Sequence, residues 1–194
     1  MRVVIAGLGN MGRSHALAYH TNPEFEVVGL MNRSPATLDA ALNDYPMYDD
    51  FYDALKATKP DLVAISTYTD SHAEYAMAAM DAGADVFVEK PLAATVDDAK
   101  AVVEKAVQSG RKLVVGYILR HHPSWQRLID ESRNLGGPFV FRMNLNQQSH
   151  GAEWETHKSL LQSTSPIVDC GVHYVDVMCQ ITDAKPVQVR GMGL

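Results

Sequence analysis

A glycine-rich segment near the N-terminus constrains the fold of this chain most. Residues 7–12 read G-x-G-x-x-G, follow the β-branched run at residues 3–6 and open a helical pattern over residues 11–19. In a strand-turn-helix context these glycines permit a tight turn, a close approach of pyrophosphate and close helix packing, and the helix N-terminus favours an anion. The sequence therefore predicts a dinucleotide-binding turn, with contacts from Gly7, Gly9, Asn10, Met11 and Gly12.

The rhythm of the first 116 residues extends this turn into a sheet. Short β-branched runs lie at residues 3–6, 27–31, 62–66, 86–88 and 113–116, separated by helical patterns at residues 11–19, 36–42, 71–82 and 96–108. Strands that alternate with helices are typical of βαβ units. We expect an α/β fold, a doubly wound parallel Rossmann domain over residues 1–117.

The pattern changes after residue 117. A helical pattern at residues 123–134 is followed by an alternating, strand-like segment at residues 139–146 and a last helical pattern at residues 167–181. We expect an α+β second domain over residues 118–194.

Composition excludes several classes of function. Seventeen Lys and Arg against 23 Asp and Glu give a net charge of −6, with no basic cluster, so we expect no nucleic-acid partner. No apolar run approaches the roughly 18 residues of a membrane span, so we expect no membrane partner and a cytoplasmic protein. No Cys and His set has metal-ligand spacing, so we expect no metal.

The expected ribose-binding position bears on the choice of cofactor. An acid that binds the adenosine ribose normally lies about 20 residues beyond the glycines. Here Asn32 stands at that position, followed by Arg33 and Ser34. These three side chains can donate hydrogen bonds to a 2′-phosphate, so the cofactor is NAD(P), leaning toward NADP. Alternatively, Arg33 is an exposed loop cation that stacks on adenine.

Two further clusters carry candidate chemistry. Glu89, Lys90 and Pro91 follow the strand at residues 86–88, at the carboxyl end where open parallel sheets bind ligands. Desolvation and a nearby cofactor cation favour a neutral lysine amine there, suited to proton transfer, although a surface lysine at a turn fits equally.

The last helical pattern supplies the second cluster. At about 100° per residue, Asp169, His173 and Asp176 share one polar face, opposite a largely apolar one. An Asp and a His at i and i+4 are suited to orienting a hydroxyl and accepting its proton. The alternative is an Asp that stabilises the helix start and a surface His.

Four segments together resemble the glucose-fructose oxidoreductase, inositol dehydrogenase and rhizopine-catabolism family, or Gfo/Idh/MocA. They are GLGNMGRSH, AISTYTDSHAEYAMAAMDAGADVFVEKPLA, GYILRHHP and IVDCGVHYVD. By motif, Lys90 matches the lysine of the family's E-K-P, and Asp169 and His173 match its D-x-x-x-H. The resemblance implies that these three residues are catalytic and that the Lys90–Pro91 peptide is cis. We also assign cofactor contacts to Thr67, His72, Glu89 and Lys90.

The resemblance implies an NAD(P)-dependent oxidoreductase that interconverts a secondary alcohol and a ketone on a sugar, cyclitol or related polyol. His173 would take the hydroxyl proton, Asp169 would hold the hydroxyl or the imidazole, and Lys90 would stabilise the alkoxide or relay the proton. The alternatives are an NAD-dependent glycoside hydrolase of the same fold, a non-catalytic dinucleotide-binding regulator, or a truncated fragment.

Two departures from the family pattern affect these expectations. Residues 163–166 read S-T-S-P where the family often has a glycine-rich run. Family members also continue with further strands, so the second domain is expected to be incomplete. A complete domain would form homo-oligomers through its sheet.

Overall fold

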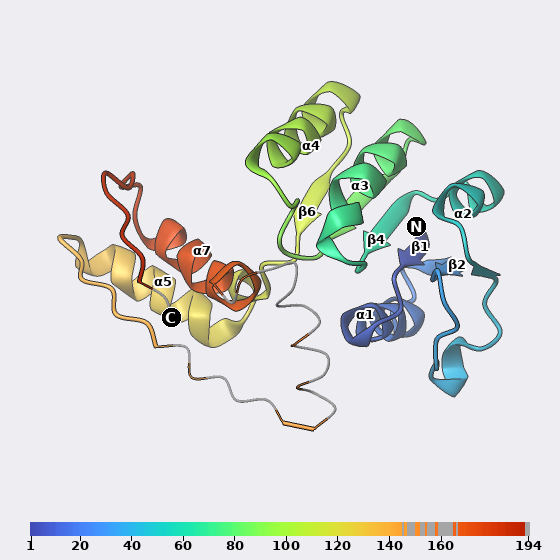
Figure 1. Ribbon diagram of the computed structural model, residues 1–194, viewed down its shortest axis with the longest axis horizontal. Coiled ribbons are helices and arrows are strands. Elements are labelled where there is room, and N and C mark those ends of the chain that lie inside the picture. The colour runs from blue at the N-terminus through green and yellow to red at the C-terminus, as the bar shows by residue number, and fades with distance from the viewer. Residues whose placement is uncertain are drawn as a thin grey trace. The chain divides into compact units, whose positions relative to one another are not determined.

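The computed structural model describes residues 1–144, 146, 150–151, 154, 158, 165 and 167–192. The chain divides into two compact units, Met1–Gly116 and Tyr117–Leu194 (Figure 1).

The first unit is built on a six-stranded sheet. Its strands are β1 (Arg2–Ala6), β2 (Glu26–Met31), β3 (Met47–Tyr48), β4 (Leu62–Ile65), β5 (Asp85–Val88) and β6 (Leu113–Val115). All neighbours pair in parallel, in the order β3-β2-β1-β4-β5-β6. This order is that of a dinucleotide-binding doubly wound sheet, with its reversal of direction between β1 and β4. The expected Rossmann fold is confirmed.

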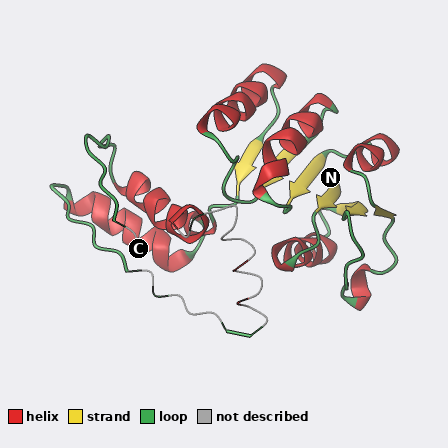
Figure 2. Ribbon diagram, in the orientation of Figure 1, coloured by secondary structure: helices red, strands yellow, loops and turns green. Residues whose placement is uncertain are grey.

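Helices cover both faces of this sheet (Figures 1 and 2). They are α1 (Asn10–Thr21), η1 (Ala40–Leu42), α2 (Phe51–Thr58), η2 (Thr69–Ser71), α3 (His72–Asp81) and α4 (Val96–Ser109). Successive side chains of β1 point to opposite faces. Val4 and Ala6 pack in one core cluster with α2, α3 and α4, whereas Val3 and Ile5 pack in another with α1 and η1.

The expected helix over residues 36–42 is wrong in extent. Only a short 3-10 turn, η1, forms there, because Asp39 is extended and its carboxylate accepts a hydrogen bond from the N–H of Ala41. Such local bonds from a side chain to the backbone compete with a helix and fix where it starts. The sequence reading also missed β3 and α2. Asp50 caps α2 by accepting hydrogen bonds from the N–H groups of Tyr52 and Asp53.

The described residues of the second unit are helical or irregular. The elements are η3 (Ile118–Arg120), α5 (Pro123–Leu135), the π-helix η4 (Ile167–Gly171) and α7 (Val172–Ile181). Ile129, Val177 and Ile181 form a small core on which Phe139 and Phe141 pack.

The expected strand over residues 139–146 is wrong for the part that the structure describes. Residues 139–144 and 146 form no strand, while residue 145 lies outside the described residues. Strands need a hydrogen-bonded neighbour, and alternation alone does not supply one. Of residues 163–166, only Ser165 is described. Among the described helices, none is long and apolar enough to cross a membrane.

Candidate functional site

The glycine-rich turn lies at the sheet's reversal point, between the ends of β1 and β4. Gly7 has a φ of +88°, and its N–H donates to the carbonyl oxygen of Met31 at 2.8 Å. A Cβ at Gly7 would lie 2.5 Å from the carbonyl oxygen of Ser66, and one at Gly12 would lie 1.8 Å from that of Gly7. Side chains at these two positions are therefore excluded by the backbone itself.

The middle glycine differs, because a Cβ at Gly9 would meet no atom within 4 Å. Gly9 begins α1 without a side-chain cap, and the first turn of α1 contains no acidic residue. Asn10 and Met11 beside it are exposed. The first N–H groups of a helix have no partner within the helix and attract anions. The turn thus fits a pyrophosphate that approaches the backbone at Gly9.

Asn32 connects this turn to the segment after β2. Its Oδ1 accepts a hydrogen bond from the N–H of Leu8 at 2.9 Å, and its Nδ2 donates to the carbonyl oxygen of Ser34 at 2.6 Å. Asn32 is half-buried, whereas Arg33 and Ser34 are exposed. The side chain that replaces the usual acid therefore braces the turn, and Arg33 is the exposed cation beside it.

The loop after β4 contains Thr67 and leads to His72 at the start of α3. His72 is only 1% exposed, and its Nδ1 lies 2.7 Å from the carbonyl oxygen of Pro91. Its Nε2 lies 3.1 Å from the carbonyl oxygen of Thr67. Ser71 donates to Thr67 Oγ1 at 2.7 Å. The His72 ring therefore contacts the backbone of two loops at the carboxyl end of the sheet.

Lys90 directly follows β5, and the peptide that joins it to Pro91 is cis, as the family resemblance implies. The Lys90 side chain is half-buried, whereas Glu89 is 6% exposed. Glu89 Oε1 accepts a hydrogen bond from His15 Nε2 at 2.8 Å, and Oε2 accepts one from the N–H of Lys90 at 3.2 Å. Sequence reasoning assigned no role to His15, although its place three residues after Gly12 on an amphipathic helix is visible in the sequence.

Asp169 and His173 belong to the second unit, and both are half-buried. Asp169 lies in the π-helix η4, where hydrogen bonds run from i to i+5, and His173 lies in α7. The constant angle per residue used to place both on one face therefore does not hold across this junction. Lys90 belongs to the other unit, so the convergence of the three side chains stays a prediction.

An ion pair that the sequence did not indicate lies beside these residues. Asp176 joined Asp169 and His173 on the expected polar face, but it is buried and both its oxygens accept hydrogen bonds from Arg120. This carboxylate raises the pKa of Arg120 further, and burial raises the pKa of Tyr117, whose ring lies 5.0 Å from the Arg120 guanidinium carbon.

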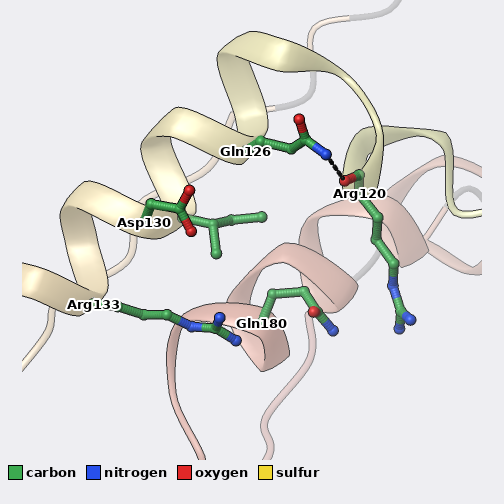
Figure 3. Close-up of a pocket in the computed structure, with 6 residues that line it drawn as sticks. Arg120, Gln126, Asp130, Arg133 and Gln180 are labelled. Atoms are coloured by element: carbon green, nitrogen blue, oxygen red, sulfur yellow. Dashed lines mark hydrogen bonds between the residues drawn. The ribbon is translucent and has the colours of Figure 1, made fainter.

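A cavity of about 370 Å³ opens between α5 and α7 (Figure 3). In Figure 3, Arg133 extends from α5 toward α7, and Gln126 donates to the carbonyl oxygen of Arg120. The cavity is lined by Arg120, Gln126, Ile129, Asp130, Arg133 and Gln180, so it contains none of the expected catalytic residues. In the part of the chain that the structure describes, no group of three His, Cys, Asp or Glu could hold a metal ion.

A family model and several known proteins match this chain. Residues 1–117 match the family model GFO_IDH_MocA, described as an oxidoreductase family with an NAD-binding Rossmann fold. An inositol 2-dehydrogenase from Salmonella typhimurium is 27% identical over 92% of this chain and 53% of its own length. A 4-carboxy-2-hydroxymuconate-6-semialdehyde dehydrogenase from Sphingobium is 31% identical over 81% of this chain and 54% of its own length.

A solved structure shares the fold over most of the chain. Scyllo-inositol dehydrogenase from Lactobacillus casei, with bound NAD(H) and scyllo-inositol, superposes with a TM-score of 0.75 at 21% identity. The match covers 94% of this chain and 56% of that structure. The chain spans about half the length of the relatives it matches. With the strand order, the glycine-rich turn and the family match in agreement, this chain belongs to the Gfo/Idh/MocA oxidoreductase family, which has an NAD-binding Rossmann fold.

Proposed function

We propose that this chain carries the cofactor-binding unit and catalytic residues of an NAD(P)-dependent oxidoreductase that interconverts a secondary alcohol and a ketone on a sugar, cyclitol or related polyol. The observation that carries the proposal is the turn at Gly9, open to a ligand at the sheet's reversal point, together with Lys90 at the end of β5 in the same unit. The inositol 2-dehydrogenase relative supports the substrate class.

Bound nicotinamide supplies the acceptor for the substrate's hydride. In the oxidation direction, His173 accepts the proton of the substrate hydroxyl, and Asp169 holds that hydroxyl or the imidazole. Lys90 stabilises the alkoxide that develops or relays the proton. These roles require the three side chains to meet at one hydroxyl group.

Cofactor binding and turnover test this function separately. Titration with NADH and NADPH, followed by fluorescence, measures binding, and nicotinamide absorbance measures turnover on inositols, glucosides and other polyols. Gly9→Val places a side chain in the pyrophosphate space and should weaken cofactor binding by about tenfold or more. Gly191→Val, another substitution into open space, is the matched control. Unchanged affinity in a folded Gly9→Val protein contradicts the binding assignment.

Lys90→Ala and His173→Ala should reduce kcat by about 100-fold or more and weaken cofactor affinity far less. If wild-type protein binds cofactor but turns over no substrate in the panel, the non-catalytic regulator becomes the better account. The relatives described above are dehydrogenases, which does not favour glycoside cleavage.

Preference for NADP over NAD is the finer part of the proposal. It rests on the absence of an acid at Asn32 and on the exposed guanidinium of Arg33. Because Asn32 already bonds Leu8 and Ser34, Arg33 is the residue that would contact a 2′-phosphate. Arg33→Ala should weaken NADPH binding about tenfold and NADH binding little, and Asn32→Asp should shift preference toward NAD. Strong NAD selectivity in the wild-type protein contradicts this preference.

A semialdehyde is the second candidate substrate. It is favoured by the Sphingobium relative, which is 31% identical and is named for a semialdehyde. Adding semialdehydes of unsaturated carboxylic acids such as muconate to the panel decides between the two substrate classes by comparing kcat/KM.

The remaining parts of the proposal concern where the protein acts and how it assembles. We place it in the cytoplasm, where the NAD(P) pools that it would use are found. If the full second domain is present, we expect copies to associate through its sheet. Cell fractionation and sedimentation of the protein test these two points.

A further inference from the structure

Lys90 lies between two residues that are each held by a histidine from a different helix. On one side, His15 of α1 donates from Nε2 to Glu89 Oε1 at 2.8 Å. On the other side, Nδ1 of His72, at the start of α3, lies 2.7 Å from the carbonyl oxygen of Pro91. All of these residues belong to the Met1–Gly116 unit.

The contacts to Glu89 are made in a confined space. The Glu89 side chain is 8% exposed and that of His15 is 20% exposed. A Cβ at Gly116 would lie only 3.0 Å from Glu89 Oε2, and the His15 ring packs on Phe87 with ring centroids 4.8 Å apart. A buried carboxylate is costly without hydrogen-bond partners. The position of Glu89 therefore depends on His15.

The consequence reaches Lys90 through its backbone. Glu89 Oε2 accepts the hydrogen bond from the N–H of Lys90, so a displaced Glu89 removes this restraint. His72, which is 1% exposed, restrains the carbonyl group of Pro91, the residue after Lys90. A carbonyl oxygen can only accept a hydrogen bond, so His72 Nδ1 is the donor in its 2.7 Å contact with Pro91.

We propose that His15 and His72 are positioning residues for Lys90. The two histidines clamp the segment Glu89, Lys90 and Pro91 from two helices and so fix the backbone that carries the Lys90 amine. This inference rests on the proposed function for the catalytic role of Lys90. The clamp itself is a property of the first unit and can be tested without turnover.

Side-chain geometry provides a rescue test. The amide nitrogen of Gln can replace the Nε2 donor of a histidine, and that of Asn can replace Nδ1. His15→Gln should therefore retain the bond to Glu89, whereas His15→Leu abolishes it. His20→Leu is the matched control, because His20 lies on the same helix and contacts Tyr45 Oη at 2.8 Å instead.

Two readouts report on the clamp directly. Hydrogen exchange of a peptide over residues 86–93 should accelerate at least about threefold in His15→Leu and stay near wild type in His15→Gln and His20→Leu. Mass spectrometry should show a changed rate of Lys90 acylation by a small reagent in His15→Leu alone. A merely structural role would accelerate exchange throughout the unit and would not distinguish Gln from Leu.

The kinetic readout links the clamp to chemistry. His15→Leu should lower kcat about 10- to 100-fold through misplacement of Lys90 and weaken NADH binding much less than that. If the wild-type protein shows no turnover, the proposed function fails, and exchange and acylation alone decide this inference.

His72 provides the second variant if His15→Leu does not fold. His72→Asn should preserve protection of the 86–93 peptide, and His72→Phe should lose it. The inference is overturned if the variants that lack a donor leave both exchange and acylation at wild-type values, or if the amide variants are as impaired as the apolar ones.

Discussion

The two units of this chain bury apolar residues to very different extents. In the first unit, Val3, Val4, Ile5 and Ala6 of β1 are all 0% exposed, because helices cover both faces of a fully paired sheet. In the described part of the second unit, Leu135 is 84% exposed and Val140 is 97% exposed. The glycine-rich turn is thus built on a dense core, whereas Asp169 and His173 lie near a small one.

Core truncation should show the largest effect and test this contrast. Ile5→Ala removes a side chain from the middle of the sheet and should reduce the free energy of unfolding by about 2–5 kcal/mol. Val140→Ala, at an exposed position, should change it by less than about 0.5 kcal/mol. Chemical denaturation measures both variants. Equal losses in the free energy of unfolding would contradict the contrast in packing between the two units.

An ion pair sharpens the comparison within the second unit. Asp176 is 7% exposed and binds Arg120, so Asp176→Asn leaves a guanidinium without its carboxylate and should destabilise the second unit by about 1.5–3 kcal/mol. Hydrogen exchange should accelerate in α5 and α7 but not in the sheet. Asp130→Asn, at an exposed position of α5, is the control. Faster hydrogen exchange in the sheet of the first unit as well would contradict this prediction.

A surface pair of the first unit should have the smallest effect. Tyr52 on α2 donates to Glu74 Oε1 on α3 at 2.5 Å, and this hydrogen bond raises the pKa of Tyr52 from 10.0 to about 12. A raised folded-state pKa means that the stabilisation is complete below pH 10 and is lost as the pH rises through 12. A pH titration followed by tyrosinate absorbance should lose the step at the highest pH in Tyr52→Phe. The control Tyr68→Phe should keep that step.

The sequence predicted the sheet of the first unit well because its strands are locally marked. Five β-branched runs became strands within a residue or two, and Thr95 and Gly110 cap α4 as ordinary start and stop signals. Asp50 is likewise a local capping signal, and it marks the start of α2.

Features that depend on distant contacts were harder to predict. The alternation near Phe139 suggested a strand, but the ring packs on a helical core, and no local signal distinguishes these outcomes. The π-helix at Ile167–Gly171 breaks the angular count that grouped Asp169 with His173. The partners of His15 and Asp176 lie 74 and 56 residues away, so their roles are set by the tertiary fold.

The bracing of the glycine-rich turn has a consequence for the thermodynamics of binding. Met31, Asn32 and Ser66 fix the backbone of the turn through contacts within the protein. The conformational entropy of this loop is therefore lost when the chain folds, before any dinucleotide arrives. Binding at a preorganised loop avoids that ordering cost. Differences in affinity between dinucleotides should accordingly reflect the contacts that each one makes, and the turn should have nearly the same structure with either.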